Sequence, residues 1–229
     1  MSNYNHFSYM IPAALACTVA AGSVCMAASL NAADYGVRPE SSDNSKAMQE
    51  LLQAAREQGA TSITLAPGKY HFRAETALPM KLFISNHDQQ AVHPVGVPVV
   101  GIKKLHIKGN GAKFIFHGKM LPFVLLDCKN ITISDISIDA AEPFSSEGRI
   151  VEIKDGKTTL KLSKSSRYTV ENGRFLLTNN GRKEDIHCAL AFEADGRMVP
   201  TGQWGDMGWG GKAEQLPGNK VRFDIDAAA

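Results

Sequence analysis

Between residues 43 and 59, the spacing of hydrophobic and polar positions predicts an amphipathic helix. Small and apolar residues recur at helical spacing and would share one face: Ala47, Met48, Leu51, Leu52, Ala54 and Ala55. Asp43 or Asn44 can serve as the N-cap, because a short polar side chain accepts a hydrogen bond from the first-turn amides. Gly59 suits the left-handed position that follows a helix. Such a helix needs a large apolar surface to lie on, and the following strands should supply it.

Period-two alternation then predicts a series of short strands. The first two, at 62–65 and 69–72, flank a Pro67-Gly68 turn. From residue 99 onward the strands are very short, and they are expected at 105–107, 114–116, 131–133 and 136–138. The segment 104–107 recurs as 130–133 about one coil further along, and a repeat of roughly 20 to 50 residues is typical of a solenoid.

Strands this short, with Asn, Ser and Asp at their corners, predict an all-β chain built as a right-handed parallel β-helix. Each coil would bury Ile, Val and Leu side chains against the coils above and below it. Alternation alone fits an antiparallel sandwich equally well, so the pattern leaves both architectures open.

After residue 143 the pattern changes to that of a small antiparallel β domain. An Asp155-Gly156 pair between the alternating runs 149–153 and 159–162 is a strong hairpin signal. Further strands are expected at 175–178, 189–193 and 220–225. We therefore divide the chain into a leader at 1–32, an N-terminal cap with the first coils of the β-helix at 33–142, and an inserted barrel-like domain at 143–229.

The first part of the chain has the pattern of a secretory signal peptide. Residues 10–30 are small and apolar and carry no charge, and Ala28-Ser29 or Ala32-Ala33 offers a cleavage junction. The run is also long enough for a transmembrane anchor, but its Ala, Gly and Ser content makes it weakly hydrophobic. We expect a secreted or periplasmic protein without stable membrane insertion, with lipoprotein anchoring at Cys17 as a minor alternative.

Composition and cysteine spacing exclude several classes of function. A net charge of +2 and the absence of charge runs give no case for nucleic acid as a partner. Cys128 and Cys188 remain after the leader, and they show neither a disulfide framework nor the spacing of metal ligands. Two buried thiols are expected, since free Cys behaves as a small hydrophobic residue. We expect no metal site and no cofactor.

Two polar clusters are candidate binding sites. Trp204, Asp206 and Trp209 lie among glycines in GQWGDMGWGG, where exposed indoles could stack on a sugar face; a packed loop is the favoured alternative. The His-Asp-x-x-x-x-His cluster at 87–93 lies in a Pro-rich loop, where a catalytic or metal-binding role is geometrically allowed. No third ligand or nucleophile stands near it in the sequence.

Several short motifs resemble known sequences. The opening motifs DYGV at 34–37, DNSxAM at 43–48 and LxPGxY at 65–70 are similar to the start of pectate-lyase-like β-helix proteins, in which the helix closes the end of the solenoid. A second set resembles the bacterial α-1,3-galactosidases of glycoside hydrolase family 110: LFISNHD at 82–88, KFIFHG at 113–118, PF at 122–123, ISID at 136–139 and EPF at 142–144. The resemblance covers roughly residues 33–226.

This resemblance implies a secreted hydrolase that removes terminal α-1,3-linked galactose from an oligosaccharide or glycoconjugate, without a cofactor and with inversion of configuration. Inversion requires a carboxylic acid and a carboxylate base roughly 6.5–9.5 Å apart. Members of the family are much longer, so we expect the catalytic pair beyond Ala229 and this chain to be an N-terminal fragment, inactive alone. Asp139 and Glu142 are the nearest candidates here, although a corner position and a solvent-facing charge describe them better. A homodimer is a further expectation.

Two alternatives of other classes stay open. A Ca²⁺-assisted polysaccharide lyase would need clustered Asp and Glu ligands with a basic residue on one β-helix face, and the sequence contains no such cluster. A non-catalytic β-helix, such as an adhesin or a carbohydrate-binding module, would have to be complete within these residues. The sequence offers fewer than about three coils, and the missing coils argue against that alternative.

Overall fold

The computed structural model describes residues 28–83, 91–179, 183–186, 188–197, 207–208 and 212–225. β-strands dominate this part of the chain, and its helix content is small, chiefly the α-helix α1 (Ser45–Glu57) and the 3₁₀ helix η1 (Ala32–Tyr35). The all-β prediction is therefore confirmed. Within the described residues, no helix is long and apolar enough to cross a membrane.

The ends of α1 carry the predicted capping residues. Asn44 occupies the N-cap position, while the neighbouring Asp43 carboxylate accepts the hydrogen bond from the Ser45 amide at 2.9 Å. At the other end Gly59 has a left-handed φ of 61°, and the amide after it donates to the Ala55 carbonyl at 2.9 Å. This last bond belongs to the Schellman motif, which satisfies carbonyl groups that the helix leaves unpaired.

The amino end of α1 is fastened to strand β3 (Gly68–Arg73). The buried Asn44 donates its backbone amide to the His71 carbonyl at 2.7 Å, and Ser45 Oγ accepts from the Arg73 amide at 2.9 Å. Asn44 Oδ1 also accepts from the Arg38 amide at 2.8 Å, which holds the loop before the helix. The helix and the strand therefore form one hydrogen-bonded unit.

Strand β6 (Leu105–His117) is the centre of a parallel sheet. It pairs in parallel with β2 (Ser62–Thr64), β3 and β8 (Ile131–Ala140), and β2 pairs in turn with β1 (Ser29–Asn31). Apolar residues lie opposite one another in register across these strands, in the two columns Leu30–Ile63–Ile107–Ile133 and Tyr70–Phe114–Ile138. Each column therefore runs perpendicular to the strands, from one to the next.

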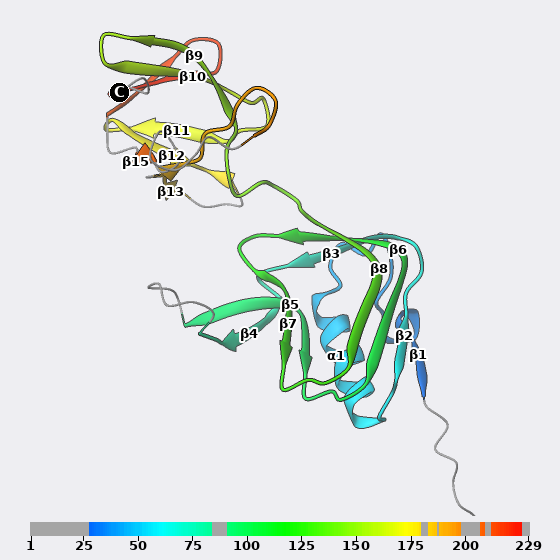
Figure 1. Cartoon of the computed structure of the whole chain (residues 1–229). Helices are drawn as coiled ribbons and strands as arrows, with labels where there is room; N and C mark the ends of the chain where they lie inside the picture. Colours follow the sequence, from blue (N-terminus) through cyan, green and yellow to red (C-terminus); the bar gives the residue numbers. More distant parts are fainter. Residues whose placement is uncertain are drawn as a thin grey trace, which may run out of the picture.

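A second set of strands lies across the hydrophobic core from the first (Figure 1). Strand β5 (Val92–Val100) pairs in parallel with β7 (Leu121–Leu126) and antiparallel with β4 (Leu78–Lys81). The core between the two sets is rich in aromatic rings: Tyr70, Phe72, Phe114, Phe116 and Phe123. Helix α1 packs against β5 and β3 and adds Met48, Leu51, Leu52 and Ala55 to this core.

In two places, a pair of short predicted strands is one continuous but bent strand in the structure. Strand β6 joins both strands predicted between 105 and 116, and β8 joins both predicted between 131 and 138. Asn110 and Asp135 adopt left-handed φ values of 51° and 57° at the bends. Gly109 is required by close packing there, because a Cβ atom at this position would lie 2.2 Å from the Asp135 carbonyl oxygen.

The described fold begins before the predicted end of the leader. Strand β1 pairs with β2, Leu30 is 8% exposed and Ala32 is 1% exposed. Cleavage at Ala32-Ala33 would remove these residues from the core, whereas cleavage at Ala28-Ser29 would leave them in place. Residues 1–27 lie outside the described part of the chain, and the leader itself stays a prediction.

Residues 148–223 form a second unit, joined to the first by the segment that leaves β8 (Figure 1). One antiparallel sheet has the order β16-β17-β10-β9 and another the order β11-β12-β13. The bounds are β9 (Gly148–Lys154), β10 (Lys157–Leu162), β11 (Tyr168–Glu171), β12 (Arg174–Leu177), β13 (Glu184–Asp185), β16 (Ala213–Leu216) and β17 (Lys220–Phe223). A shorter pair consists of β14 (Cys188–Ala189) and β15 (Met207–Gly208).

The second unit has its own small core. Buried residues from three strands form it, namely Leu162, Ala213, Val221 and Phe223, with the rings of Tyr168 and Phe175 packed against them. The predicted Asp155-Gly156 hairpin is confirmed, and both residues have positive φ, as a two-residue hairpin turn requires. The strand predicted at 189–193 is wrong in extent, since β14 ends at Ala189.

Candidate functional site

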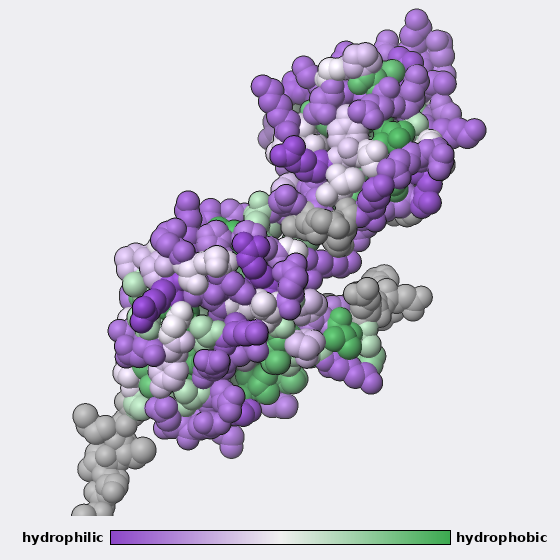
Figure 2. Space-filling model, turned by 180° about the vertical axis from the view of Figure 1, so that it is seen from behind, coloured by the Kyte–Doolittle hydropathy of each residue, from purple (hydrophilic) through white to green (hydrophobic). Residues whose placement is uncertain are grey.

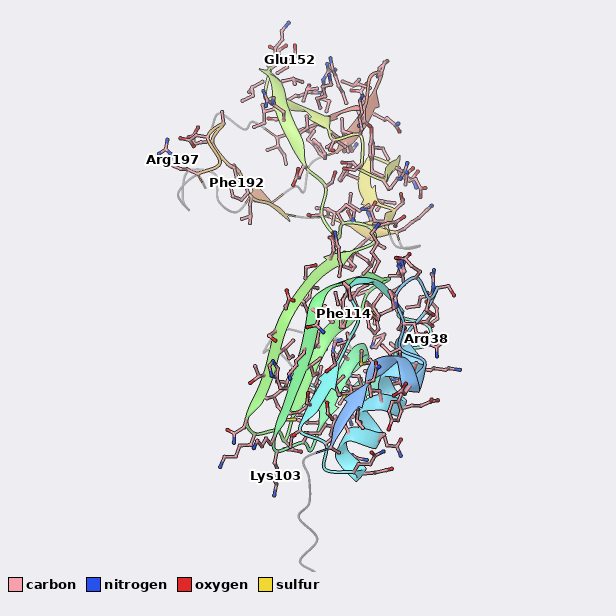
Figure 3. The ribbon with its side chains drawn as sticks, turned by 90° about the vertical axis from the view of Figure 1, so that its right-hand side faces the viewer. Arg38, Lys103, Phe114, Glu152, Phe192 and Arg197 are labelled. Carbon is pink, nitrogen blue, oxygen red and sulfur yellow. The ribbon has the colours of Figure 1, made fainter. Side chains whose placement is uncertain are left out.

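A polar face on β3, β6 and β8 gathers titratable side chains. Successive residues of a strand point to opposite sides, so where Tyr70 and Phe114 point into the core, their neighbours point outward. The outward residues along these strands include His71, Arg73, Lys113, His117 and Asp139. Figure 3 shows Phe114 within the first unit, on the inner side of the same sheet. The pairing of the three strands therefore brings these ionisable side chains onto one face of the first unit.

His71 and His117 form a hydrogen-bonded pair on this face. Nδ1 of His71 lies 2.8 Å from Nε2 of His117, and the ring centroids are 5.1 Å apart. Burial lowers the pKa of His117, and the charges of Arg73 and His71 lower it further against the opposing effect of Glu75 and Asp43. His117 therefore loses its proton more readily than a free histidine does, and one ring nitrogen of the pair donates a hydrogen bond to the other.

Asp43, whose charge also acts on His117, forms hydrogen bonds at the start of helix α1. Burial raises the pKa of its carboxyl group, but hydrogen bonds from Thr76 and Ser45 and the charge of Arg73 outweigh burial and leave the pKa lowered. The carboxylate is thus held in its ionised form as a hydrogen-bond acceptor. Its bonds are structural, since they connect the first turn of α1 to the turn after β3.

Asp139 is on the outward side of strand β8 rather than at a corner. Its carboxylate lies 2.9 Å from Lys113 Nζ, and both side chains are about half exposed. The hydrogen bond and the charge of Lys113 lower the pKa of Asp139. An ionised, lysine-paired carboxylate is a poor proton donor. Glu142, the other candidate for the catalytic pair, follows the end of β8 and is exposed.

Of the other predicted site residues, the structure describes His93 and not the rest. Trp204, Asp206 and Trp209 lie outside the described residues, and so do His87 and Asp88.

His93 belongs to strand β5, opposite Met80 of β4, and not to a loop. Sequence analysis missed β5 because Pro94, Gly96 and Pro98 gave the segment the pattern of a loop. Nε2 of His93 is buried and has no hydrogen-bond partner among the described residues. Cys128 is half-buried, and its thiol donates to the Val99 carbonyl at 3.3 Å.

Sequence analysis also missed the histidine pair, because 46 residues separate its members. A signal did exist. The segments HFR at 71–73 and FIFH at 114–117 are matching strands with Phe inward and His outward, and β3 pairs with β6 in register. Within the described residues, no group of three or more His, Cys, Asp or Glu side chains could hold a metal ion.

Comparison with known proteins gives matches over most of the chain. Residues 146–228 match the family described as GLAA-B beta-barrel domain I. Alpha-1,3-galactosidase B of Akkermansia muciniphila is 34% identical over 209 residues, which are 90% of this chain and 26% of the relative. Alpha-1,3-galactosidase B of Parabacteroides distasonis is 34% identical over 172 residues, 72% of this chain and 28% of the relative.

A third relative is of the A type. Alpha-1,3-galactosidase A of Shewanella woodyi is 34% identical over 156 residues, which are 67% of this chain and 26% of the relative. The aligned residues make up between a quarter and a third of the length of each of these three relatives.

Proposed function

We propose that this chain forms the amino-terminal part of an enzyme that removes terminal α-1,3-linked galactose. The chain is homologous to the α-1,3-galactosidases, as its motifs predicted. The observation that carries this proposal is the 34% identity over 90% of the chain. An alignment of that extent includes residues of both structural units. The substrate would be an oligosaccharide or glycoconjugate, and the enzyme would be secreted or periplasmic.

In this proposal the first unit is the start of a right-handed parallel β-helix. Its columns of stacked residues support that architecture, since each parallel strand lies directly over the one before it. The exposed apolar side chains of β7 and β8, the last two strands of this unit, also support the β-helix architecture. Ile138 on β8 is 54% exposed, and Leu125 and Leu126 on β7 are 49% and 40% exposed. These apolar side chains, together with the edges of β7 and β8 that pair with no other strand of the described residues, form the surface on which a further coil would stack.

The catalytic acid and base would lie on such further coils. A glycosidase acid needs a raised pKa, because it must hold a proton at the pH of the reaction. Among the described carboxyl groups whose pKa departs from its ordinary value, Asp43, Asp139 and Asp195 all have it lowered. An inverting mechanism would place a second carboxyl group roughly 6.5–9.5 Å from the acid, with a water molecule between it and the sugar.

A chimeric enzyme tests this proposal. Residues 28–225 of this chain would replace the matching segment of the Akkermansia muciniphila relative. We expect the chimera to release galactose from an α-1,3-linked galactoside, with β-galactose as the first product by proton NMR. The unmodified relative is the positive control, and the present chain alone is expected to release no galactose.

Three results would contradict the proposal. A chimera that does not fold, by circular dichroism, would show that the two segments are not equivalent. α-Galactose as the first product would exclude inversion. An unsaturated product that absorbs in the ultraviolet would indicate a polysaccharide lyase instead.

A further inference from the structure

Three basic side chains form a row on the outer face of the four-stranded sheet of the second unit. Because successive residues of a strand alternate, Leu162 and Val221 point into the core while Lys161 and Lys220 point outward. Lys161 on β10 stands directly opposite Arg149 on β9 and directly opposite Lys220 on β17. Arg149, Lys161 and Lys220, called the basic row below, therefore cross three adjacent strands in register.

Two other basic side chains on this face are paired with carboxylates, whereas Lys154, which lies opposite Lys157, forms no ion pair with a described residue. Arg222 lies 3.7 Å from Glu152 and 3.6 Å from Glu214, and Lys157 lies 3.1 Å from Asp224. The basic row, in contrast, forms no ion pair with any residue that the structure describes. Like charges directly opposite one another destabilise a sheet. The fold therefore keeps an unfavourable arrangement, which an anionic ligand would relieve.

The basic row is linear and accessible. Arg149 and Lys161 are exposed, and Lys220 is half-buried. Hydrophilic residues cover most of the visible surface of this unit in Figure 2. Adjacent strands lie ~4.8 Å apart, so the three charges extend over roughly 10 Å in a direction that crosses the strands. A chain that carries several anionic groups could contact all three.

We propose that the basic row binds a sulfated glycan chain. This inference rests on the proposed glycosidase function, from which it takes the class of polymer. The next row of outward residues on this sheet contains Glu152, Arg222 and Glu214. In that row the two carboxylates lie on either side of Arg222. They would repel a broad anionic surface such as duplex nucleic acid or an anionic bilayer, whereas a thin chain along the basic row avoids them.

Single-stranded nucleic acid fits this face less well. The outward positions of β9, β10, β16 and β17 carry charged residues, Thr159 and Leu216, and no aromatic residue on which a base could stack. With a sulfated glycan held here, the second unit would keep a polymeric substrate near the catalytic coils and raise its effective concentration.

Binding of dextran sulfate to the complete chain tests the inference. The probe is fluorescein-labelled dextran sulfate, followed by fluorescence anisotropy at 0.1 M salt, with neutral dextran of equal length for comparison. The test variant carries R149Q, K161Q and K220Q. The control variant loses the same charge elsewhere and carries K103Q, K104Q and K129Q, all of them exposed. Figure 3 shows that Lys103 and Glu152 of β9 lie at opposite ends of the molecule.

We expect the test variant to bind dextran sulfate about tenfold more weakly than the unchanged chain, since each exposed charge contact contributes a modest amount. The control variant should bind within about twofold of the unchanged chain, and neutral dextran should not bind. Melting curves of the test variant at low salt should show equal or higher stability, because removal of like charges relieves repulsion.

Three outcomes would overturn the inference. The two variants could lose affinity equally, the test variant could bind as the unchanged chain does, or single-stranded DNA and anionic phospholipid vesicles could bind the basic row as tightly as dextran sulfate. Dextran sulfate contains no galactose, so its binding is measured independently of hydrolysis. An active chimera with no binding of dextran sulfate would refute this inference alone and leave the proposed function intact.

Discussion

Ile138 is the residue at which stacking of a further coil can be measured most directly. It completes the column that begins with Tyr70 and Phe114, yet its side chain is 54% exposed. Truncation of a fully buried Ile to Ala costs about 2–5 kcal/mol. Because roughly half of this side chain is already in water, we expect Ile138→Ala to cost about 1 kcal/mol in the present chain.

In the chimeric enzyme the expected cost is larger. A further coil stacked on β8 would bury Ile138, so the same substitution should cost about 2–5 kcal/mol there. Ile107→Ala is the matched control, since Ile107 is 1% exposed and already lies between Ile63 and Ile133. It should cost about 2–5 kcal/mol in both proteins.

Urea unfolding followed by far-ultraviolet circular dichroism measures both costs, provided that the slope with urea stays unchanged. The reasoning fails if Ile138→Ala costs the same small amount in the chain and in the chimera. It also fails if Ile107→Ala is as mild as Ile138→Ala, because the column would then not be a packed core.

Other predictions concern the first unit. Gly109→Ala should prevent stable folding or lower the melting temperature strongly, because the new Cβ would lie 2.2 Å from the Asp135 carbonyl oxygen; a thermal melt by circular dichroism checks this. The lowered pKa of His117 means that the folded chain holds this imidazole neutral where the unfolded chain binds a proton. Stability should therefore fall as the pH drops below the ordinary pKa of 6.5, and His117→Gln should flatten that dependence in urea titrations between about pH 5 and 8. A chain that begins at Ser29 should melt higher than one that begins at Ala33, since the shorter chain lacks β1 and the buried Leu30; equal melting temperatures would contradict the early start of the fold.

Local rules predicted the capped helix and the hairpin well. The helix has its apolar spacing, an acidic capping residue and Gly59 within one short segment, so few distant contacts were needed to predict it. The hairpin at Asp155 is equally local, because the turn residues and both alternating strands are adjacent in the sequence.

Long-range features could not be predicted in the same way. Strand β5 contains prolines that suggest a loop, and only its pairing with β4 and β7 makes it a strand. The histidine pair depends on the register of β3 against β6. The basic row likewise depends on pairing, since Arg149, Lys161 and Lys220 are far apart in a sequence that has no charge run.

The hydrogen bonds that fasten α1 to β3 also imply an order of folding. Helix α1 and strands β2 and β3 lie within residues 45–73, so their mutual contacts close shorter loops than the pairing of β2 and β3 with β6 does. Each later parallel strand then needs an earlier one as its template, as in other repeat folds. Because the amino end of a chain is synthesised first, this template would be complete before the strands that pair with it have been made.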